Sequence, residues 1–222
     1  MTIRDDAEFV LYGNVRSGNS YKTALMLSLT ETPYRFKSVD LMAGENLKPD
    51  FLRVNPLGKV PVLKHKGLVL RQSYDTLRYL ADVTGKYGPN GWQEEARVGE
   101  WVGYCVDFLT FGLNRLRFIK LFTDGMPEVF DYFKQTADRG LPIIETHLKD
   151  HEWLAAGRPT YADIVACTGM NMLEDAGYSW ADYPASAAWM KRFEKLPHFA
   201  TREALLPPPA GAAPVPMGKA RS

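Results

Sequence analysis

A proline inside an apolar run is the feature that most constrains how this chain can fold. The run belongs to the segment NPLGKVPVL, residues 55–63, in which Val60, Val62 and Leu63 are typical of a strand. Proline has no amide N–H, so an interior strand position loses a hydrogen bond of the sheet unless it lies at an edge or a bulge. Pro61 therefore predicts that the backbone beside it is unpaired within the sheet and available to pair with something else.

The composition indicates an ordinary globular protein of one large domain or two small ones. Of the 222 residues, 45% are hydrophobic and 24% are charged, and the formal net charge is +1. This balance gives no reason to expect nucleic acid or an anionic membrane surface as a partner. No run approaches the roughly 18 apolar residues of a membrane helix, and the first residues are too charged for a signal peptide. We therefore expect a cytoplasmic protein.

Neither the cysteines nor the histidines predict a metal site. Cys105 and Cys167 are far apart and match no metal-binding or redox spacing, so we expect small buried hydrophobic residues in a reducing compartment. His147 and His151 are one helical turn apart, but no Glu follows His147 as it would in a zinc-binding helix. We expect no bound metal.

The first third of the chain alternates between strand and helix patterns. The predicted order is a strand, a helix, a strand, a short helical link, a hairpin that turns near Lys66 and Gly67, and a helix that ends at Gly85. A βαβ half followed by a ββα half is the thioredoxin plan. The corresponding segments are 8–13, 17–29, 34–41, 46–55, 59–70 and 73–85.

A glycine-rich and proline-containing cluster at 85–92 separates this region from a second half that reads as almost entirely helical. From Trp101 onward, aromatic residues recur in steps of three and four, which predicts one continuous stripe along a helix. A second apolar stripe predicts that this helix is buried on two sides. The first stripe is Trp101, Tyr104, Phe108, Phe111, Arg115, Phe118 and Phe122, and the second is Val102, Cys105, Leu109, Leu116 and Ile119.

The chain is therefore expected to be a two-domain α+β protein. We predict a thioredoxin-like domain over 1–86, an all-helical domain over 87–205 and a disordered, Pro/Ala-rich tail over 206–222. Within the helical domain, Thr160 and Asp163 have the spacing of a helix-start box, in which each side chain accepts a hydrogen bond from the other's backbone. We interpret this box as structural.

Three motifs together resemble the cytosolic glutathione S-transferase family. They are NPLGKVPVL, the RQS at residues 71–73 that opens a helix, and PTYADI at residues 159–164. The similarity extends over residues 9–205. It implies a thioredoxin-like N-terminal domain, an α-helical C-terminal domain, glutathione as co-substrate and a homodimer.

The resemblance implies that the segment around Pro61 binds glutathione. In the family this proline is cis, so that the N–H and C=O of Val60 face outward and hold the cysteinyl part of glutathione like an added strand; Lys59 belongs to the same segment. Ser73, where a helix begins, would bind the γ-glutamyl carboxylate, and Gln72 the γ-glutamyl amine. The family commonly has Glu before this serine, so Gln72 binds without charge assistance. Alternatively, Pro61 only makes a turn and Ser73 only caps the helix.

The resemblance places the chemistry in the turn RSGNSYK, residues 16–22, where Ser17 and Asn19 match bacterial members with a Ser/Thr and an Asn near the sulfur. A thiol with a pKa of about 8.5 is mostly protonated at neutral pH, and donors at a helix N-terminus stabilise its thiolate. Tyr12 and Tyr21 are less suitable, because one lies on the preceding strand and the other a turn into the helix. The alternative is that Ser17 and Asn19 only cap the helix.

In the family, the electrophile binds against the first long helix of the second domain. This makes Tyr104, Phe108, Phe111 and Arg115 candidate pocket residues. The aromatic stripe would suit an apolar or aromatic co-substrate, although such a stripe is more often core. Arg115 on an apolar face needs a partner, either an acidic side chain or a carboxylate of the substrate.

The leading expectation is an enzyme of detoxification that conjugates the glutathione thiolate to an electrophilic small molecule. One alternative is glutathione-dependent reduction of disulfides or organic hydroperoxides at the same site. The other is a non-catalytic, transferase-like module that binds ligands or a protein partner. The N-terminal domain contains no cysteine, so mixed-disulfide chemistry on the protein is not available there.

Overall fold

The computed structural model describes residues 2–123 and 127–208, which fall into two compact units. The first unit consists of the residues up to Lys86 together with residues 196–208, and the second of the described residues between 87 and 195. Among the helices of these described residues, none combines the length and apolar character needed to span a membrane.

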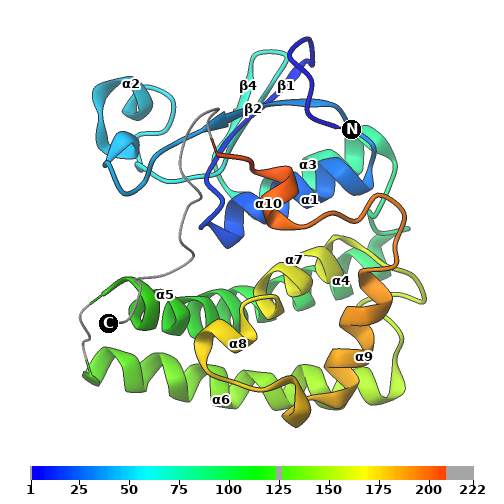
Figure 1. Ribbon diagram of the computed structural model, residues 1–222. Helices are drawn as coiled ribbons and strands as arrows, with labels where there is room; N and C mark the ends of the chain where they lie inside the picture. The colour runs from blue at the N-terminus through cyan, green and yellow to red at the C-terminus, as the bar shows by residue number, and fades with distance from the viewer. Residues whose placement is uncertain (1, 124–126, 209–222) are drawn as a thin grey trace. The chain divides into compact units, whose positions relative to one another are not determined.

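The first unit has the thioredoxin-like plan that the sequence predicts. Its elements are β1 (Phe9–Gly13), α1 (Gly18–Leu29), β2 (Tyr34–Ser38), the 3-10 helix η1 (Glu45–Leu47), α2 (Pro49–Leu52), β3 (Val62–His65), β4 (Leu68–Leu70), α3 (Ser73–Thr84) and α10 (Arg202–Leu205). The strands form one sheet in the order β2-β1-β3-β4, in which β1 is parallel to β2 and the other pairs are antiparallel. Helices α1 and α3 pack against each other on one side of the sheet, and α10 contacts α1 (Figure 1).

Turn residues explain two strand ends in this unit. The hairpin between β3 and β4 turns at Lys66 and Gly67 as predicted, and both have positive φ (45° and 83°), a region that glycine enters at little cost. β2 is shorter than the predicted segment 34–41. It ends at Ser38 because the Asp40 carboxylate accepts hydrogen bonds from the backbone N–H groups two and three residues further on, which starts a turn.

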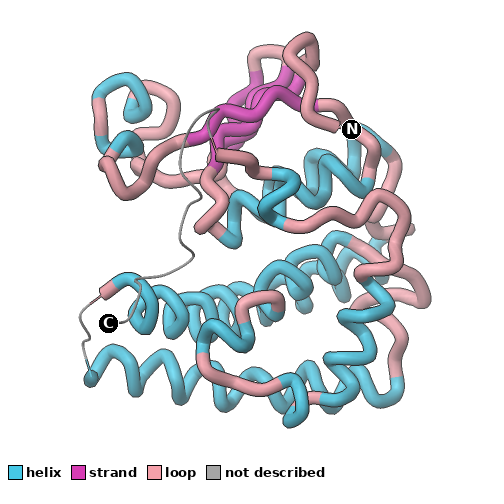
Figure 2. Tube along the Cα trace, in the orientation of Figure 1, coloured by secondary structure: helices cyan, strands magenta, loops and turns pink. Residues whose placement is uncertain are grey.

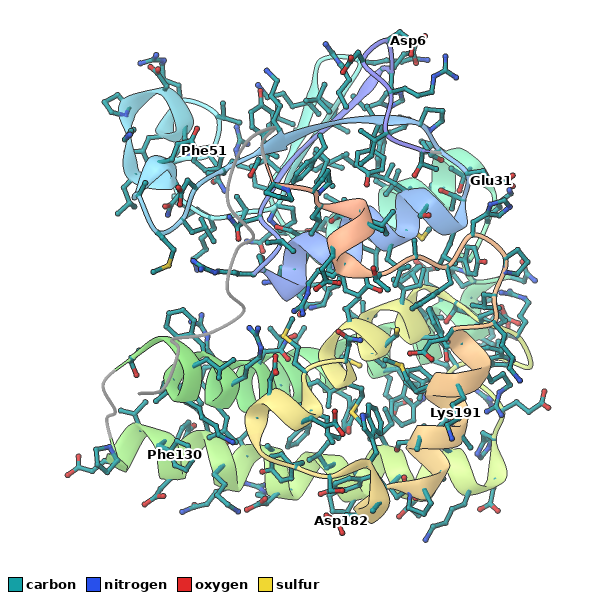
Figure 3. All side chains as sticks on the ribbon, in the orientation of Figure 1. Asp6, Glu31, Phe51, Phe130, Asp182 and Lys191 are labelled. Carbon is teal, nitrogen blue, oxygen red and sulfur yellow. The ribbon has the colours of Figure 1, made fainter. Side chains whose placement is uncertain are left out.

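An apolar cluster joins the segment before β3 to α2. Val60 and Val62 pack with Val39 and with Phe51 of α2, which is labelled in Figure 3, and all four are at most 9% exposed. The helical link predicted over 46–55 thus forms as η1 and α2, and Phe51 attaches it to the start of β3. Burial of these side chains holds the backbone of Val60 in place.

Residues 196–205 belong to the first unit, whereas the sequence analysis assigns them to the helical domain. Three hydroxyl groups of α1 and β2 donate to backbone carbonyls of this segment. They are Ser28 Oγ to His198 O (2.7 Å), Tyr21 OH to Ala200 O (3.0 Å) and Tyr34 OH to Leu205 O (2.7 Å). Leu206, the first residue of the predicted tail, is buried, and residues 209–222 lie outside the described residues.

The second unit consists of helices and the loops between them (Figure 2). They are α4 (Trp92–Tyr104), the π-helical η2 (Cys105–Leu113), α5 (Asn114–Phe122), α6 (Pro127–Asp150), α7 (Tyr161–Met170), α8 (Leu173–Ala176), the 3-10 helix η3 (Trp180–Asp182) and α9 (Pro184–Phe193). η2 continues α4 directly into α5 and contacts both α6 and α7.

The π-helical η2 interrupts the continuous helix predicted from Trp101 onward. A π-helix has more residues per turn than an α-helix, so successive side chains are separated by a smaller angle around the helix axis. Residues at α-helical spacing therefore do not stay on one face through η2. The second predicted stripe is largely core, but the aromatic stripe is not buried along its length. Among these residues Cys105, Leu109, Leu116 and Ile119 are buried, whereas Phe111 and Phe118 are 45% and 48% exposed.

Two further predictions for this unit are confirmed. α7 begins with the predicted helix-start box, in which the Asp163 carboxylate accepts a hydrogen bond from Thr160 N at 2.9 Å. Neither Cys105 nor Cys167 forms a disulfide, and neither side chain has exposed surface. Burial raises the pKa of the Cys167 thiol, which makes it a poor nucleophile.

Close packing of α6 against η2 predicts the effect of one methyl group at Gly140. A Cβ there would lie 2.4 Å from Phe108 Cβ, whereas a Cβ at Gly103 on α4 would meet no atom within 4 Å. Gly140→Ala should lower the free energy of unfolding by about 1–3 kcal/mol through overpacking. Gly103→Ala, the matched control, should raise it by about 0.5–1 kcal/mol because alanine favours the helix. Urea denaturation measures both, and equal effects would contradict tight packing at Gly140.

Candidate functional site

The sheet topology brings three segments together at one end of the first unit. The register of β1 and β3 places the end of β1, which leads to Ser17, beside the start of β3, which follows Val60. The register of β3 and β4 places the end of β4, which leads to Ser73, at the same end. Ser17, Val60 and Ser73 are far apart in the sequence, yet their segments meet there.

Asparagine side chains hold the loop that precedes β3. Asn55 is fully buried; its Nδ2 donates to Lys59 O at 2.7 Å and its Oδ1 accepts from Leu57 N at 3.1 Å. Asn46 Nδ2 donates to Gly58 O at 2.7 Å. The two carbonyls that lead up to the proline are thus satisfied by side chains, and the loop keeps one shape without strand pairing.

Val60 is left out of the sheet. Its peptide bond to Pro61 is cis, as the resemblance implies, and β3 begins only at Val62. In the described part of the chain, neither the N–H nor the C=O of Val60 takes part in a backbone hydrogen bond. The expectation that the backbone beside Pro61 is unpaired is confirmed. The side chain of Lys59, the preceding residue, is exposed.

Ser73 lies in the first turn of α3, and its side chain does not cap that helix. The N-cap residue is Gln72, which is exposed, and no side chain makes a capping hydrogen bond. Ser73 is only 4% exposed, and among the described residues its hydroxyl has no hydrogen-bond partner. The first N–H groups of a helix lack acceptors within it, so this hydroxyl and these groups together suit an anion.

Ser17 and Asn19 lie at the start of α1. Ser17 is the N-cap, and its Oγ accepts from Ser20 N at 3.2 Å. This contact uses a lone pair of the oxygen, so the hydroxyl hydrogen is still able to donate. Asn19 Oδ1 accepts from Lys22 Nζ at 2.9 Å, and its Nδ2 has no acceptor in the part of the chain that the structure describes. Both side chains therefore keep donors at the helix N-terminus.

Buried polar contacts align α1 with α3. Lys22 Nζ donates to Tyr74 OH at 3.1 Å, and the Oγ1 atoms of Thr23 and Thr76 are 2.9 Å apart. The paired positions advance in the same direction along both helices, so α1 and α3 are parallel and begin at the same end. Their positively polarised N-termini therefore both favour negative charge at that end of the unit.

Lys22 and Asn55 support the site, although their sequence context predicts no role for either. Lys22 has no exposed surface and bonds Asn19 of the first turn and Tyr74, the residue after Ser73. It is the only charged residue of α1, GNSYKTALMLSL, and that isolated charge in a helix with apolar periodicity was the available signal. Asn55 gave no comparable signal, since a loop asparagine is ordinary.

Contacts elsewhere in the first unit engage the two tyrosines nearest to Ser17 in the sequence. The Tyr21 hydroxyl donates to Ala200 O at 3.0 Å, in the segment that returns to this unit. The Tyr12 ring packs edge-on against Phe51, and the ammonium of Lys64 lies 5.1 Å from its centroid. The expectation that Ser17 and Asn19, rather than a tyrosine, act on a thiol stays a prediction.

The four predicted electrophile-pocket residues have different surroundings in the second unit. Tyr104 OH donates to Gly140 O at 3.0 Å, burial raises the pKa of this tyrosine, and Phe108 packs over the same glycine. Both of these side chains are half-buried and pack against α6. Phe111 is 45% exposed and contacts two aromatic rings of α6, and Arg115 is exposed.

The expectation that Arg115 lies on an apolar face and needs a partner is wrong. The buried arginine is Arg117, which is 3% exposed and donates from Nε to Asp175 Oδ2 at 2.7 Å. The change of helical register at η2 rotates Arg115 to the surface and Arg117 into the core.

Models of known protein families match residues in both units. The family model of the glutathione S-transferase N-terminal domain matches residues 7–82, and that of the C-terminal domain matches residues 126–197. The chain belongs to the glutathione S-transferase family. All the residues placed at the end of the sheet, from Ser17 to Ser73, lie within the matched N-terminal domain of this transferase.

Individual relatives align with most of this chain. The glutathione S-transferase theta-1 of Bos taurus is 31% identical over 173 residues, covering 73% of this chain and 72% of that protein. The disulfide-bond oxidoreductase YfcG of Escherichia coli is 29% identical over 197 residues, covering 85% and 90%. A crystal structure of a possible glutathione S-transferase from Rhodopseudomonas palustris has a TM-score of 0.82 and 32% identity, covering 88% of this chain and 90% of that one.

The two family models do not cover this glutathione S-transferase evenly. The four electrophile candidates on α4, η2 and α5 precede the matched part of the C-terminal domain, which begins at residue 126. The family match therefore supports the glutathione-binding half most directly. It gives least information on the helices that would choose the second substrate.

Proposed function

We propose that this protein binds glutathione at the end of its sheet and transfers the glutathione thiolate to an electrophilic small molecule. The observation that carries the proposal is the meeting, at that end, of the unpaired backbone of Val60, the helix N-terminus at Ser73 and the donors of Ser17 and Asn19. Glutathione presents a backbone, a carboxylate and a thiol, and each of the three features suits one of them.

The proposed binding mode uses one contact for each part of the tripeptide. The N–H and C=O of Val60 pair with the cysteinyl backbone like an added strand. The Ser73 hydroxyl and the first N–H groups of α3 bind the γ-glutamyl carboxylate, and Gln72 binds the amine. Lys59, exposed in the same segment as Pro61, attracts the anionic tripeptide.

Activation of the thiol follows from the first turn of α1. Lowering a thiol pKa by about two units requires about 2.7 kcal/mol of stabilisation of the thiolate. The Ser17 hydroxyl, the Asn19 amide and the N-terminus of α1 supply donors and a favourable dipole. The thiolate then forms the new bond to the electrophilic carbon, and the bond from that carbon to the leaving group breaks, so that the leaving group departs with its electron pair, as chloride does from 1-chloro-2,4-dinitrobenzene. The thiol proton passes to solvent.

The rest of the proposal concerns the setting of the reaction. We place the protein in the cytoplasm, where two buried cysteines that form no disulfide remain reduced, as a homodimer that acts in detoxification. The electrophile is apolar or aromatic. Of the four candidates for its contacts, Phe111 and Arg115 are exposed, and Tyr104 and Phe108 are half-buried.

Removal of the Ser73 hydroxyl should weaken glutathione binding. Ser73→Ala removes one hydrogen bond to a charged group, so the binding free energy should fall by about 1.5–3 kcal/mol. Isothermal titration calorimetry measures it. Ser186→Ala is the matched control, because Ser186 is also a buried serine in the first turn of a helix, α9. Unchanged affinity in Ser73→Ala would remove Ser73 from the glutathione site.

Ser17 and Asn19 should act together on the glutathione sulfur. Ser17→Ala and Asn19→Ala should each raise the pKa of the bound thiol and slow conjugation near neutral pH, while glutathione affinity changes little. The double variant should cost more than either one but less than their sum, because the helix N-terminus remains. Ultraviolet titration of the bound thiolate gives the pKa. A bound-thiol pKa that stays at the value of the unaltered protein in all three variants would contradict this mechanism.

Disulfide reduction is a second candidate because the relative YfcG is named a disulfide-bond oxidoreductase. The same activated thiolate would attack a disulfide, release one thiolate and form a mixed disulfide with glutathione. A second glutathione would then release the other thiol as oxidised glutathione is formed. No cysteine of the protein takes part, since both lie buried in the second unit.

Replacement of both cysteines by alanine should leave either activity intact per folded molecule, although it can lower stability. Parallel assays with 1-chloro-2,4-dinitrobenzene and with 2-hydroxyethyl disulfide identify the preferred reaction. If loss of Cys105 or Cys167 stopped turnover in a folded, glutathione-binding protein, the thiol-free mechanism would be wrong. Glutathione binding without turnover of either substrate would identify a binding module.

A further inference from the structure

Lys22 is a buried cation in an unfavourable position. It has no exposed surface, and it lies in the second turn of α1, close to the helix end whose dipole disfavours positive charge. Burial of an ammonium group also costs free energy even when it is hydrogen-bonded. An apolar side chain at this position would be easier to accommodate, so the lysine points to a role other than stability.

The hydrogen bond between Lys22 and Asn19 determines which way the asparagine amide faces. An ammonium group can only donate, so the atom 2.9 Å from Lys22 Nζ must be the carbonyl oxygen Oδ1. The amide nitrogen Nδ2, with both its N–H groups, is then directed away from Lys22. Among the described residues nothing accepts from Nδ2, so both donors are available to a ligand.

The same lysine also reaches the second helix of the site. Its Nζ donates to Tyr74 OH at 3.1 Å and lies 4.6 Å from the centroid of that ring. Tyr74 directly follows Ser73, the residue proposed to bind the γ-glutamyl carboxylate. One ammonium group therefore connects the turn that would hold the sulfur with the turn that would hold the carboxylate.

We propose that Lys22 is a positioning residue of the glutathione site: it fixes the Asn19 amide with its N–H groups toward the substrate sulfur and holds that amide at a set distance from the Ser73 turn. The proposal rests on the proposed function, since it assumes that glutathione binds at this end of the sheet. Lys22 touches no substrate and acts through Asn19. Without it, the amide is free to rotate and to present its oxygen, which repels a thiolate.

The test compares Lys22→Met, Asn19→Ala and the double variant in the full-length protein. Methionine keeps most of the length of lysine but has no donor. Lys22→Met should raise the pKa of bound glutathione by about one unit, a tenfold smaller fraction of thiolate at neutral pH. The double variant should show no larger shift than Asn19→Ala alone, because Lys22 acts through that amide. Ultraviolet titration measures the pKa, and calorimetry the affinity for glutathione.

Thr23→Val is the matched control. Thr23 is the next residue, is equally buried and packs at the same interface between α1 and α3, where it bonds Thr76. Thr23→Val should lower the stability of the protein without changing the pKa of the bound thiol. A pKa shift in Lys22→Met alone would therefore indicate a positioning effect and not a general loosening of the helices. A thiol pKa that is unchanged in Lys22→Met, shifts that add in the double variant, or an equal shift in Thr23→Val would each overturn the proposal.

Nuclear magnetic resonance of the unaltered protein covers the case in which Lys22→Met does not fold. The two Nδ2 protons of Asn19 should give separate signals, and one should shift as the bound glutathione thiol titrates. If neither Nδ2 proton changes its chemical shift as the thiol titrates, the proposal is overturned. If the unaltered protein does not bind glutathione, the proposed function fails together with the role of Lys22. If it binds glutathione but the variants or the Asn19 signals give a contradicting result, only the role of Lys22 is overturned.

Discussion

The buried polar contact between α1 and α3 is the constraint on which the candidate site depends. Lys22 bonds Tyr74, and further along both helices Thr23 bonds Thr76, so the two helices are parallel and start at the same end. A purely apolar interface tolerates sliding of one helix along the other, whereas a buried hydrogen bond that slips leaves unsatisfied groups at about 1–3 kcal/mol each. These contacts therefore set the distance between the two helix starts that carry Ser17 and Ser73.

Side-chain contacts hold the unpaired backbone of Val60, just before β3, in one conformation. An unpaired backbone segment is normally mobile, but here Asn55 and Asn46 bond the two preceding carbonyls, and the Val60 side chain is buried against Phe51. The backbone groups of Val60 thus stay unpaired without becoming disordered. A peptide that pairs with them meets an edge whose conformational entropy has already been lost on folding, which favours binding.

The elements of the first unit were predictable because their boundaries depend on local signals. Glycine at the hairpin and at the end of α3, and Pro61 before β3, act within a few residues, and the sequence shows them directly. The attachment of residues 196–205 to α1 and β2 has no such signal, because hydroxyl groups far away in the sequence bond only its backbone. The attachment of that segment to the first unit is therefore visible only in the structure.

The errors in the second unit have a different origin. Aromatic residues repeat at about 3.6-residue spacing through η2, but the backbone there is π-helical, so the repeat does not stay on one face. Nothing in the spacing distinguishes Arg115 from Arg117, because the decision depends on how many residues the wide turns include. The same limit applies to Lys22, whose burial depends on the approach of α3.

The absence of a cysteine from the first unit explains why the supporting groups matter so much. Both cysteines of the chain are buried in the second unit, and burial raises the pKa of Cys167, so neither is placed to act as a nucleophile. In the proposed mechanism the reacting sulfur therefore arrives with the substrate, and the protein contributes donors and a dipole. Each such donor contributes little unless its direction is set in advance. A serine that caps its helix and an asparagine held by a buried lysine both have set directions. Conjugation and disulfide reduction would need the same preparation of the thiolate, so the donors at the start of α1 do not distinguish between these two proposed reactions.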